Sequence, residues 1–226
     1  MFRIFCLLIG YAFGCVQTAY IIGKAVYKID IRAEGSGNAG TTNVTRIMGA
    51  KAGAIVFLVD VCKAVAAYVL CSWIFNGQGS FVPGVTNLGG VDLAGNGYLP
   101  GLYAGIGVVC GHNFPFYMKF KGGKGIASTV GVTLSFHWLG GLVAGLIGLM
   151  GVVITKYISV TSLILTALFP VTMIILRGHI AAHFTETLVL GFAVMAMAWY
   201  QHRGNIARLL KGTENKFSIG KGKKSK

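Results

Sequence analysis

Charged side chains are scarce in this sequence. Asp, Glu, Lys and Arg make up 12% of its 226 residues, whereas hydrophobic residues make up 54%. A water-soluble domain of this size needs more charges to cover its surface, so the composition excludes one. The mean hydropathy of +0.70 and the 34 glycines indicate an integral membrane protein, in which small residues let helices pack backbone to backbone.

Acidic residues are the scarcest charged group, with 6 against 20 lysines and arginines and a net charge of +14. In a soluble protein such a charge would suggest a nucleic-acid partner. Here the basic residues lie between apolar segments and in the tail. We therefore expect them to fix the membrane topology and to bind anions, with no nucleic-acid partner.

Redox and metal-binding motifs are also missing. The five cysteines lie in apolar stretches and form no C-x-x-C pair, which indicates unpaired, buried thiols. No histidines cluster with carboxylates or cysteines in a metal-binding pattern. We expect neither a metal nor another cofactor.

The most informative segment is GHNFPFYMKFKGGKG at 111–125. Gly122, Gly123 and Gly125 allow backbone dihedrals in which amide N–H groups turn toward one anion, with Lys124 beside them as a point charge. If the apolar run after Gly125 begins a helix, its N-terminus adds to the attraction. The segment is not a nucleotide-binding P-loop, because Met118 replaces the first glycine of that motif. The alternative is a lysine-rich loop that only fixes topology.

The apolar segments predict an all-α integral membrane protein with seven transmembrane helices in one polytopic domain over 1–226. Residues 126–154 are ambiguous, because they are too long for one ordinary span and short for two, but a break near His137 resolves them. With the break, 17 of the basic residues lie on one side and 2 on the other, whereas without it the counts are 9 and 10. The positive-inside rule favours the break, with the N-terminus outside and the C-terminus in the cytoplasm. The predicted spans are 4–23, 52–75, 99–112, 125–137, 139–155, 158–176 and 186–201, with a basic tail at 216–226.

Two other features follow from this topology. Asp60 and Lys63 lie three residues apart in the second span, so we expect them to pair toward the bundle interior, with a direct role in the site as the alternative. The segment 76–98 contains no lysine or arginine and reads as an extracytoplasmic loop.

Three polar segments at 35–46, 111–125 and 202–215 fall on the cytoplasmic face in this topology. Their hydroxyl, amide, guanidinium and ammonium groups suit a small phosphorylated polyol. Arg46 can grip phosphate oxygens in two places, and Lys124 adds a compact charge. The uncharged donors of the first segment are Ser36, Asn38, Thr41, Thr42 and Asn43.

His202 and Asn205 lie three apart, so a helix would place them on one face. His202 can orient or deprotonate a hydroxyl, or only hydrogen-bond its own loop, and the sequence leaves these roles open. Glu214 reads as a partner of a local basic residue rather than a base. His137, His179 and His183 fall on the other face.

The three segments resemble a known family. GSGNAGTTNVTRIMGAKAG at 35–53, GHNFPFYMKFKGGKGIAS at 111–128 and HRGNIARLLKGTE at 202–214 are similar to the three motifs of the bacterial PlsY-type acyl-phosphate:glycerol-3-phosphate acyltransferases. The resemblance implies a seven-helix fold with its motifs at the cytoplasmic face of the inner membrane. It also implies transfer of a fatty acyl group from acyl phosphate to the 1-hydroxyl of glycerol 3-phosphate, which yields lysophosphatidic acid and phosphate in an early step of phospholipid synthesis.

Residue by residue, the resemblance implies that Ser36, Arg46, Lys124, His202 and Asn205 are the catalytic residues. The remaining motif positions are expected to bind substrate: Gly37, Asn38, Gly40, Thr41, Thr42, Asn43, His112, Asn113, Gly122, Gly123, Gly125 and Glu214. The expected partners are the two substrates and the lipid bilayer, and the oligomeric state stays open, a monomer included.

The chemistry agrees with this implication. Acyl phosphate is already activated, so orientation and oxyanion stabilisation suffice without a strong protein nucleophile. The sequence has no Ser-His-Asp set and no H-x-x-x-x-D pair, and we expect a substrate phosphate to take the hydroxyl proton while His202 orients. Two alternatives stay open, a transporter of phosphorylated solutes and a scaffold that binds anionic lipid.

Overall fold

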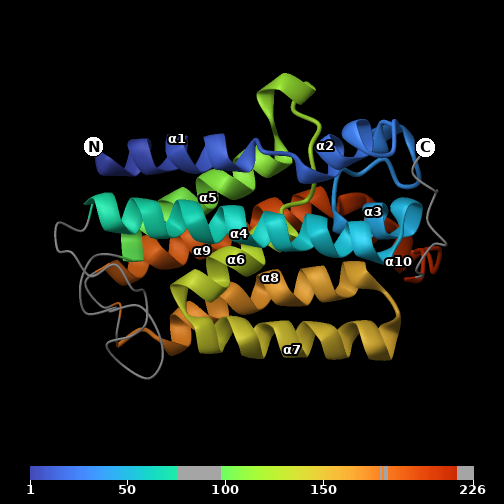
Figure 1. Ribbon diagram of the computed structural model, residues 1–226. Helices are drawn as coiled ribbons and strands as arrows, with labels where there is room; N and C mark the ends of the chain where they lie inside the picture. The colour runs from blue at the N-terminus through green and yellow to red at the C-terminus, as the bar shows by residue number, and fades with distance from the viewer. Residues whose placement is uncertain (76–97, 179, 181–182, 218–226) are drawn as a thin grey trace.

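The computed structural model describes residues 1–75, 98–178, 180 and 183–217, and all the regular elements in these ranges are helices (Figure 1). The predicted loop at 76–98, up to residue 97, lies outside the described residues, as do His179 and the tail from residue 218. The helices are α1 (Phe2–Gly14), α2 (Thr18–Ala25), α3 (Thr41–Met48), α4 (Ala50–Phe75), α5 (Tyr98–Asn113), α6 (Ile126–Phe136), α7 (Trp138–Thr155), α8 (Ile158–Ile175), α9 (Phe184–Gln201) and α10 (Arg203–Leu210).

The long helices lie side by side, and the N-terminus and α10 lie at opposite ends of the bundle (Figure 1). Within the part of the chain that the structure describes, four segments are long and apolar enough to cross a membrane: Phe2–Ala25, Ala50–Phe75, Trp138–Thr155 and Ile158–Ile175. The short helices α3 and α10 lie together at the end of the bundle where α4 begins and α9 ends (Figure 1).

The expected break near His137 is present. Helix α6 ends at Phe136 and α7 begins at Trp138. The Nδ1 atom of His137 accepts a hydrogen bond from the backbone N–H of Gly140 at 2.9 Å, so this side chain caps the start of α7.

The predicted first span, 4–23, falls within the candidate membrane segment Phe2–Ala25. This segment is not one continuous helix, because the chain leaves the helix at Cys15–Gln17 and resumes as α2. The break is stabilised from outside the segment. Lys63 of α4 donates to the carbonyl of Val16 at 2.7 Å, and Gln17 donates to the carbonyl of His112 at 2.9 Å. Gln17 also donates to the Gly14 carbonyl at 3.3 Å. The Gly14 and Val16 carbonyls, which the interrupted helix leaves without backbone partners, thus gain side-chain donors inside a membrane protein, and the bond to His112 ties the break to α5.

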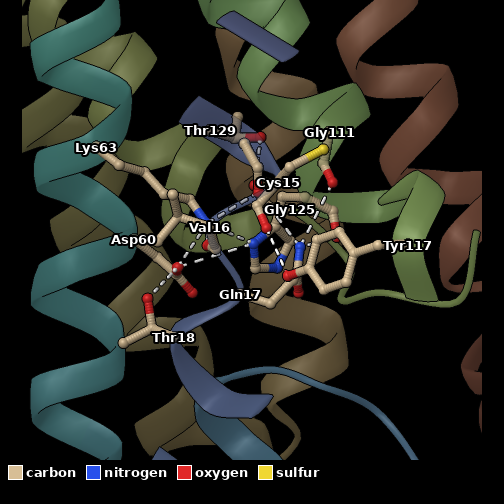
Figure 2. A network of polar contacts seen from close by, with 12 residues as sticks. Cys15, Val16, Gln17, Thr18, Asp60, Lys63, Gly111, Tyr117, Gly125 and Thr129 are labelled. Atoms are coloured by element: carbon tan, nitrogen blue, oxygen red, sulfur yellow. Dashed lines mark hydrogen bonds and ion pairs between the residues drawn. The ribbon is translucent and has the colours of Figure 1, made fainter. Parts of the chain in front are cut away.

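The expected pairing of Asp60 with Lys63 is confirmed. The Lys63 ammonium lies 2.7 Å from the Asp60 carboxylate, and the two residues are 7% and 1% exposed. Both side chains point from α4 toward the break between α1 and α2 (Figure 2).

Helix α5 forms the centre of the bundle. It has only 16 residues, and 14 of them are buried, so it contacts neighbouring helices rather than lipid along nearly all its length. At about 1.5 Å per residue such a helix is shorter than a bilayer core. Its burial explains how a short segment is tolerated at this position.

The packing of α1 against α5 depends on glycine. A Cβ atom at Gly10 would lie 1.9 Å from the Ala104 carbonyl oxygen, and one at Gly107 would lie 2.3 Å from the Leu7 carbonyl oxygen. Gly14 and Gly111 are equally close to the opposite backbone. The two helices therefore contact each other directly through their backbones, as the glycine content predicts.

We predict that Gly107→Leu strongly destabilises the fold, because backbone atoms cannot move aside as a flexible side chain can. Overpacking costs about 1–3 kcal/mol in ordinary cores, and we expect at least this loss here. Thermal unfolding in detergent measures it. Gly145→Ala is the matched control, because nothing lies within 4 Å of the added Cβ, and an unfolding temperature equal to that of Gly107→Leu would contradict the packing.

Candidate active site

One cavity of about 850 Å³ brings the three polar segments together. The two short helices that carry two of these segments, α3 and α10, lie at the same end of the bundle (Figure 1). Of the residues predicted to bind or catalyse, those that line the cavity are Ser36, Gly37, Asn38, Gly40, Thr41, Thr42, Asn43, Arg46, His112, Lys124, Gly125, His202, Asn205 and Glu214. Asn113, Gly122 and Gly123 are not in its lining.

The first segment is a tight loop that leads into α3, and Asn43 organises it. The Asn43 side chain accepts from the backbone N–H of Ser36 at 2.9 Å and donates to the Glu34 and Ile31 carbonyls at 2.9 and 3.2 Å. A Cβ at Gly35, where φ is +59°, would lie 2.4 Å from Asn43 Oδ1. The Asn43 amide is thus committed to the loop, which places Ser36 at the cavity.

Arg46 is the free cation of this segment. It lies in the last turn of α3 and lines the cavity. Within the described residues its guanidinium has no hydrogen-bond or ion-pair partner, in contrast to Arg32, which binds Asp30 at 2.8 Å. This ion pair lowers the pKa of Asp30 to about 2. A guanidinium without a carboxylate partner at a cavity wall is suited to a bidentate contact with an anion.

The second segment supplies Lys124 and the N-terminus of α6. Helix α6 begins at Ile126, as expected, and Gly125 precedes it with φ at +73°. Gly125, Ile126 and Ala127 line the cavity beside Lys124. The first turn of α6 therefore adds backbone N–H groups and a partial positive charge to this wall.

The expectation that Gly122 and Gly123 direct amide groups at an anion is wrong. The N–H of Gly122 donates to the Asn113 carbonyl at 3.1 Å, and that of Gly123 donates to the His112 carbonyl at 2.9 Å. These glycines instead allow close packing, because a Cβ at Gly122 would lie 2.1 Å from the His112 carbonyl oxygen. Asn113, 1% exposed, lies behind Gly125, where its Oδ1 would be 2.8 Å from an added Cβ.

The third segment bends at His202, between α9 and α10, and this residue is 2% exposed. Its Nδ1 lies 2.8 Å from the Ala198 carbonyl oxygen. Because a carbonyl can only accept, Nδ1 carries the proton and Nε2 is left as the acceptor. Burial and the charge of Lys124 lower the pKa of His202 to about 4, so the imidazole is neutral at pH 7.

Asn205 joins the second and third segments. The Lys124 ammonium donates to Asn205 Oδ1, and Asn205 Nδ2 donates to Glu214 at 2.6 Å. Glu214 also accepts from Arg208 at 2.8 Å and from Ser159 at 3.1 Å. The predicted pairing of Glu214 with a local basic residue is therefore present. The carboxylate fixes the Asn205 amide so that its oxygen faces Lys124.

The charge of Lys124 is not neutralised by direct contact with a carboxylate. Burial lowers its pKa to about 8, with the charge of Arg208 acting in the same direction and that of Glu214 opposing both. Protonated Lys124 is therefore a poorly solvated cation near neutral pH. Such a group gains more from a bound anion than a cation that is surrounded by water.

Sequence reasoning missed the other wall of the cavity. Its apolar residues come from α4, α6, α7 and α8: Phe57, Val130, Leu149, Val152, Ile158 and Leu165. Their side chains do not differ from other apolar residues of these helices, so no local pattern marks them. The cavity is thus lined both by cations and by apolar side chains, which is the combination that an amphipathic ligand requires.

Comparison with known sequences gives the same family over almost the whole chain. A family model described as glycerol-3-phosphate acyltransferase matches residues 4–212. A glycerol-3-phosphate acyltransferase of Thermoanaerobacter pseudethanolicus is 40% identical over 217 residues, which are 96% of this chain and 96% of the relative. One of Shouchella clausii is 37% identical and covers 93% of each chain.

Comparison with solved structures agrees. The crystal structure of PlsY (YgiH), an integral membrane glycerol 3-phosphate acyltransferase, in its glycerol 3-phosphate form has a TM-score of 0.77 and 28% identity, covering 96% of both chains. Its lysophosphatidic acid form has a TM-score of 0.75 with the same coverage.

We predict that anion binding at the cavity weakens as pH rises through about 8, because Lys124 then loses its proton. The dissociation constant of methyl phosphate should rise several-fold between about pH 7 and pH 9, a range in which a phosphate monoester with a second pKa near 6 changes its own charge little. Isothermal titration calorimetry measures it. Lys124→Arg should abolish the pH dependence, since guanidinium stays charged, and a constant affinity of the wild-type protein would exclude Lys124 as the anion ligand.

Proposed function

Since this chain belongs to the glycerol-3-phosphate acyltransferase family, we propose that it transfers a fatty acyl group from acyl phosphate to the 1-hydroxyl of glycerol 3-phosphate. The products are lysophosphatidic acid and inorganic phosphate. The single observation that carries this proposal is the cavity, which combines cations from all three polar segments with an apolar wall from α4, α6, α7 and α8. Glycerol 3-phosphate suits the cations, and a fatty acyl chain suits the apolar wall.

We assign the catalytic roles to Ser36, Arg46, Lys124, His202 and Asn205, which all line this cavity. Arg46 and Lys124 hold phosphate oxygens, because they are cations without a contacting carboxylate. Ser36 and the first turn of α6 supply uncharged donors to phosphate or to the developing oxyanion. Asn205 positions Lys124, and Glu214 holds Asn205.

The reaction forms one ester bond and breaks one acyl–phosphate bond. The 1-hydroxyl oxygen attacks the acyl carbon, and the C–O bond to phosphate breaks as phosphate leaves with the bonding electrons. The proton of the hydroxyl passes to a phosphate oxygen of the substrates. Because the donor is already activated, the cavity has to orient two reactants and stabilise negative charge, and no covalent enzyme intermediate is needed.

His202 suits an orienting role better than that of a general base. With a pKa of about 4, its imidazole is a weak base at pH 7, where an effective base has a pKa near the working pH. Its Nε2 can still accept a hydrogen bond from the 1-hydroxyl and align it toward the acyl carbon. Burial next to Lys124 keeps the His202 imidazole neutral, and this supports the orienting role.

We further propose a seven-span topology in the bacterial inner membrane, with the N-terminus outside and the cavity facing the cytoplasm. The single polytopic domain would cross the membrane with α1–α2, α4, α5, α6, α7, α8 and α9. The charge distribution supports this topology, because it leaves 17 basic residues on the cytoplasmic side and 2 outside. Family membership supports an acyltransferase over a transporter of phosphorylated solutes.

The donor is tested with purified protein, radiolabelled glycerol 3-phosphate and three donors: acyl phosphate, acyl-CoA and acyl-carrier protein. We predict that lysophosphatidic acid forms with acyl phosphate alone, and that Arg46→Ala lowers kcat/KM at least about 100-fold, since an Arg–phosphate contact is a bidentate charge-assisted one. Lys24→Ala should retain activity, because Lys24 lies in the last turn of α2 and is not in the cavity lining. Product from acyl-CoA in place of acyl phosphate would overturn the proposed donor.

The role of His202 is tested separately with His202→Ala. We expect kcat to fall less than about 100-fold, the lower limit usual for loss of a general base, with glycerol 3-phosphate binding nearly intact. Single-turnover kinetics and calorimetry measure the two quantities. Complete loss of turnover with binding preserved would make His202 the general base instead.

A further inference from the structure

A second group of buried polar residues adjoins the cavity and forms part of its lining. Asp60 and Lys63 of α4 meet His112 of α5 at the break between α1 and α2, and the exposed fractions of the three residues are 1%, 7% and 4%. Figure 2 shows Lys63, Asp60 and Thr18 converging beside Val16 and Gln17. Asp60 and His112 line the cavity, whereas Lys63 does not.

The Lys63 ammonium uses its three protons on three structural elements. It lies 2.7 Å from Asp60, 2.7 Å from the Val16 carbonyl oxygen and 3.0 Å from His112 Nδ1. An ammonium can only donate, so His112 Nδ1 is the acceptor and the imidazole is neutral with its proton on Nε2. Thr18 donates to the same Asp60 oxygen at 3.2 Å. The orientation and the tautomer of His112 are therefore fixed by Lys63.

The other edge of the His112 ring supports the loop that carries Lys124. A Cβ at Gly123 would lie 2.0 Å from His112 Nε2 and 3.0 Å from the Ala39 carbonyl oxygen. The backbone of Gly123 also donates to the His112 carbonyl. The first and second polar segments thus both lie against the residue immediately before Lys124, with the imidazole beneath it.

We propose that Asp60, Lys63 and His112 form a buried positioning unit that sets the place of Lys124 in the cavity. The unit connects the α1–α2 break, α4 and α5 to the Gly123–Lys124 turn. Lys63, which is not in the cavity lining, acts on Lys124 through His112, and Asp60 acts by holding Lys63. The inference rests on the proposed acyl transfer, since the position of Lys124 is meaningful only for a bound phosphate.

Charge pairing by itself does not account for this arrangement. A buried pair can be replaced by neutral residues of similar volume with little loss of stability, whereas removal of one partner leaves an unpaired charge. The double variant Asp60→Asn/Lys63→Met therefore separates the two roles. It removes both charges together, and it also removes the donor that fixes His112.

The experiment compares wild type, Asp60→Asn/Lys63→Met and His112→Gln in the acyl phosphate assay, with thermal unfolding in parallel. We expect His112→Gln to unfold near the wild-type temperature and the double variant to unfold at a lower one, because the Val16 carbonyl loses its Lys63 donor. Assayed below these temperatures, both variants should lose at least about 10-fold in kcat, since a displacement of about 1 Å costs up to 100-fold. Thr166→Val is the matched control, because the buried Thr166 hydroxyl bonds only to carbonyls of its own helix, and it should leave kcat unchanged.

A pH profile gives a readout that a purely structural role would not change. Burial holds the pKa of Lys124 at about 8, so the activity of the wild type should fall on the alkaline side near that value. If the unit fails, Lys124 becomes better solvated, and the alkaline limb should move toward the ordinary lysine value of about 10.4. His202, Arg208 and Glu214 face Lys124 and are the same in all variants.

The outcomes are distinct. Folded variants with wild-type kcat and an unshifted alkaline limb would refute the positioning unit. Loss of kcat with an unshifted limb would also refute it, because Lys124 would then have kept its environment. Absence of product from the wild type with acyl phosphate would instead refute the proposed donor, and the other variants would not be needed to reach that conclusion.

Discussion

The candidate site depends on Lys124, a cation whose ammonium is held by a neutral amide rather than by a carboxylate. Lys124 donates to the amide oxygen of Asn205, and the carboxylate of Glu214 lies one hydrogen bond further away. A direct Lys124–Glu214 ion pair would neutralise the charge and compete with any anion. The intervening amide holds the ammonium in place and leaves its charge available. Glu214 is held by Arg208 and Ser159, so the carboxylate that fixes the arrangement lines the cavity without contacting Lys124.

The bundle makes this arrangement rigid by two different means. On the side of α1 and α5, glycines bring the backbones of the two helices into direct contact. At these contacts no side chain separates the helices, so none can shift to change their packing. On the side of α4, Lys63 donates to the Val16 carbonyl at the break between α1 and α2, and Gln17 donates to the Gly14 carbonyl there. The break would expose polar backbone to an apolar interior without them. Both devices meet at the end of α5, where the chain enters the loop of Lys124.

Much of the helical framework could be predicted from the sequence, because it depends on local patterns. Apolar length gives the helices, and His137 marks the break between α6 and α7. The spacing of Asp60 and Lys63 predicts their pairing. The break at Cys15–Gln17 could not be predicted, because its cause lies in Lys63 and His112 rather than in the broken segment itself. The role of Gly122 and Gly123 could not be predicted for a related reason, because a glycine needed for a close contact looks the same in sequence as one needed for a positive φ.

The candidate site divides in the same way. Residues such as Arg46 and Lys124 were identifiable because charge is rare in this chain and each charge needs an explanation. The apolar wall was not, because Leu149 and Val152 resemble every other residue that faces lipid. Yet this wall explains why the reaction belongs in a membrane protein. The proposed donor, a fatty acyl phosphate, is insoluble at one end and charged at the other, while glycerol 3-phosphate is soluble throughout. A cavity lined by cations from the three polar segments and by apolar residues of four helices would let each substrate keep its own environment while the hydroxyl and the acyl carbon meet where the two environments join.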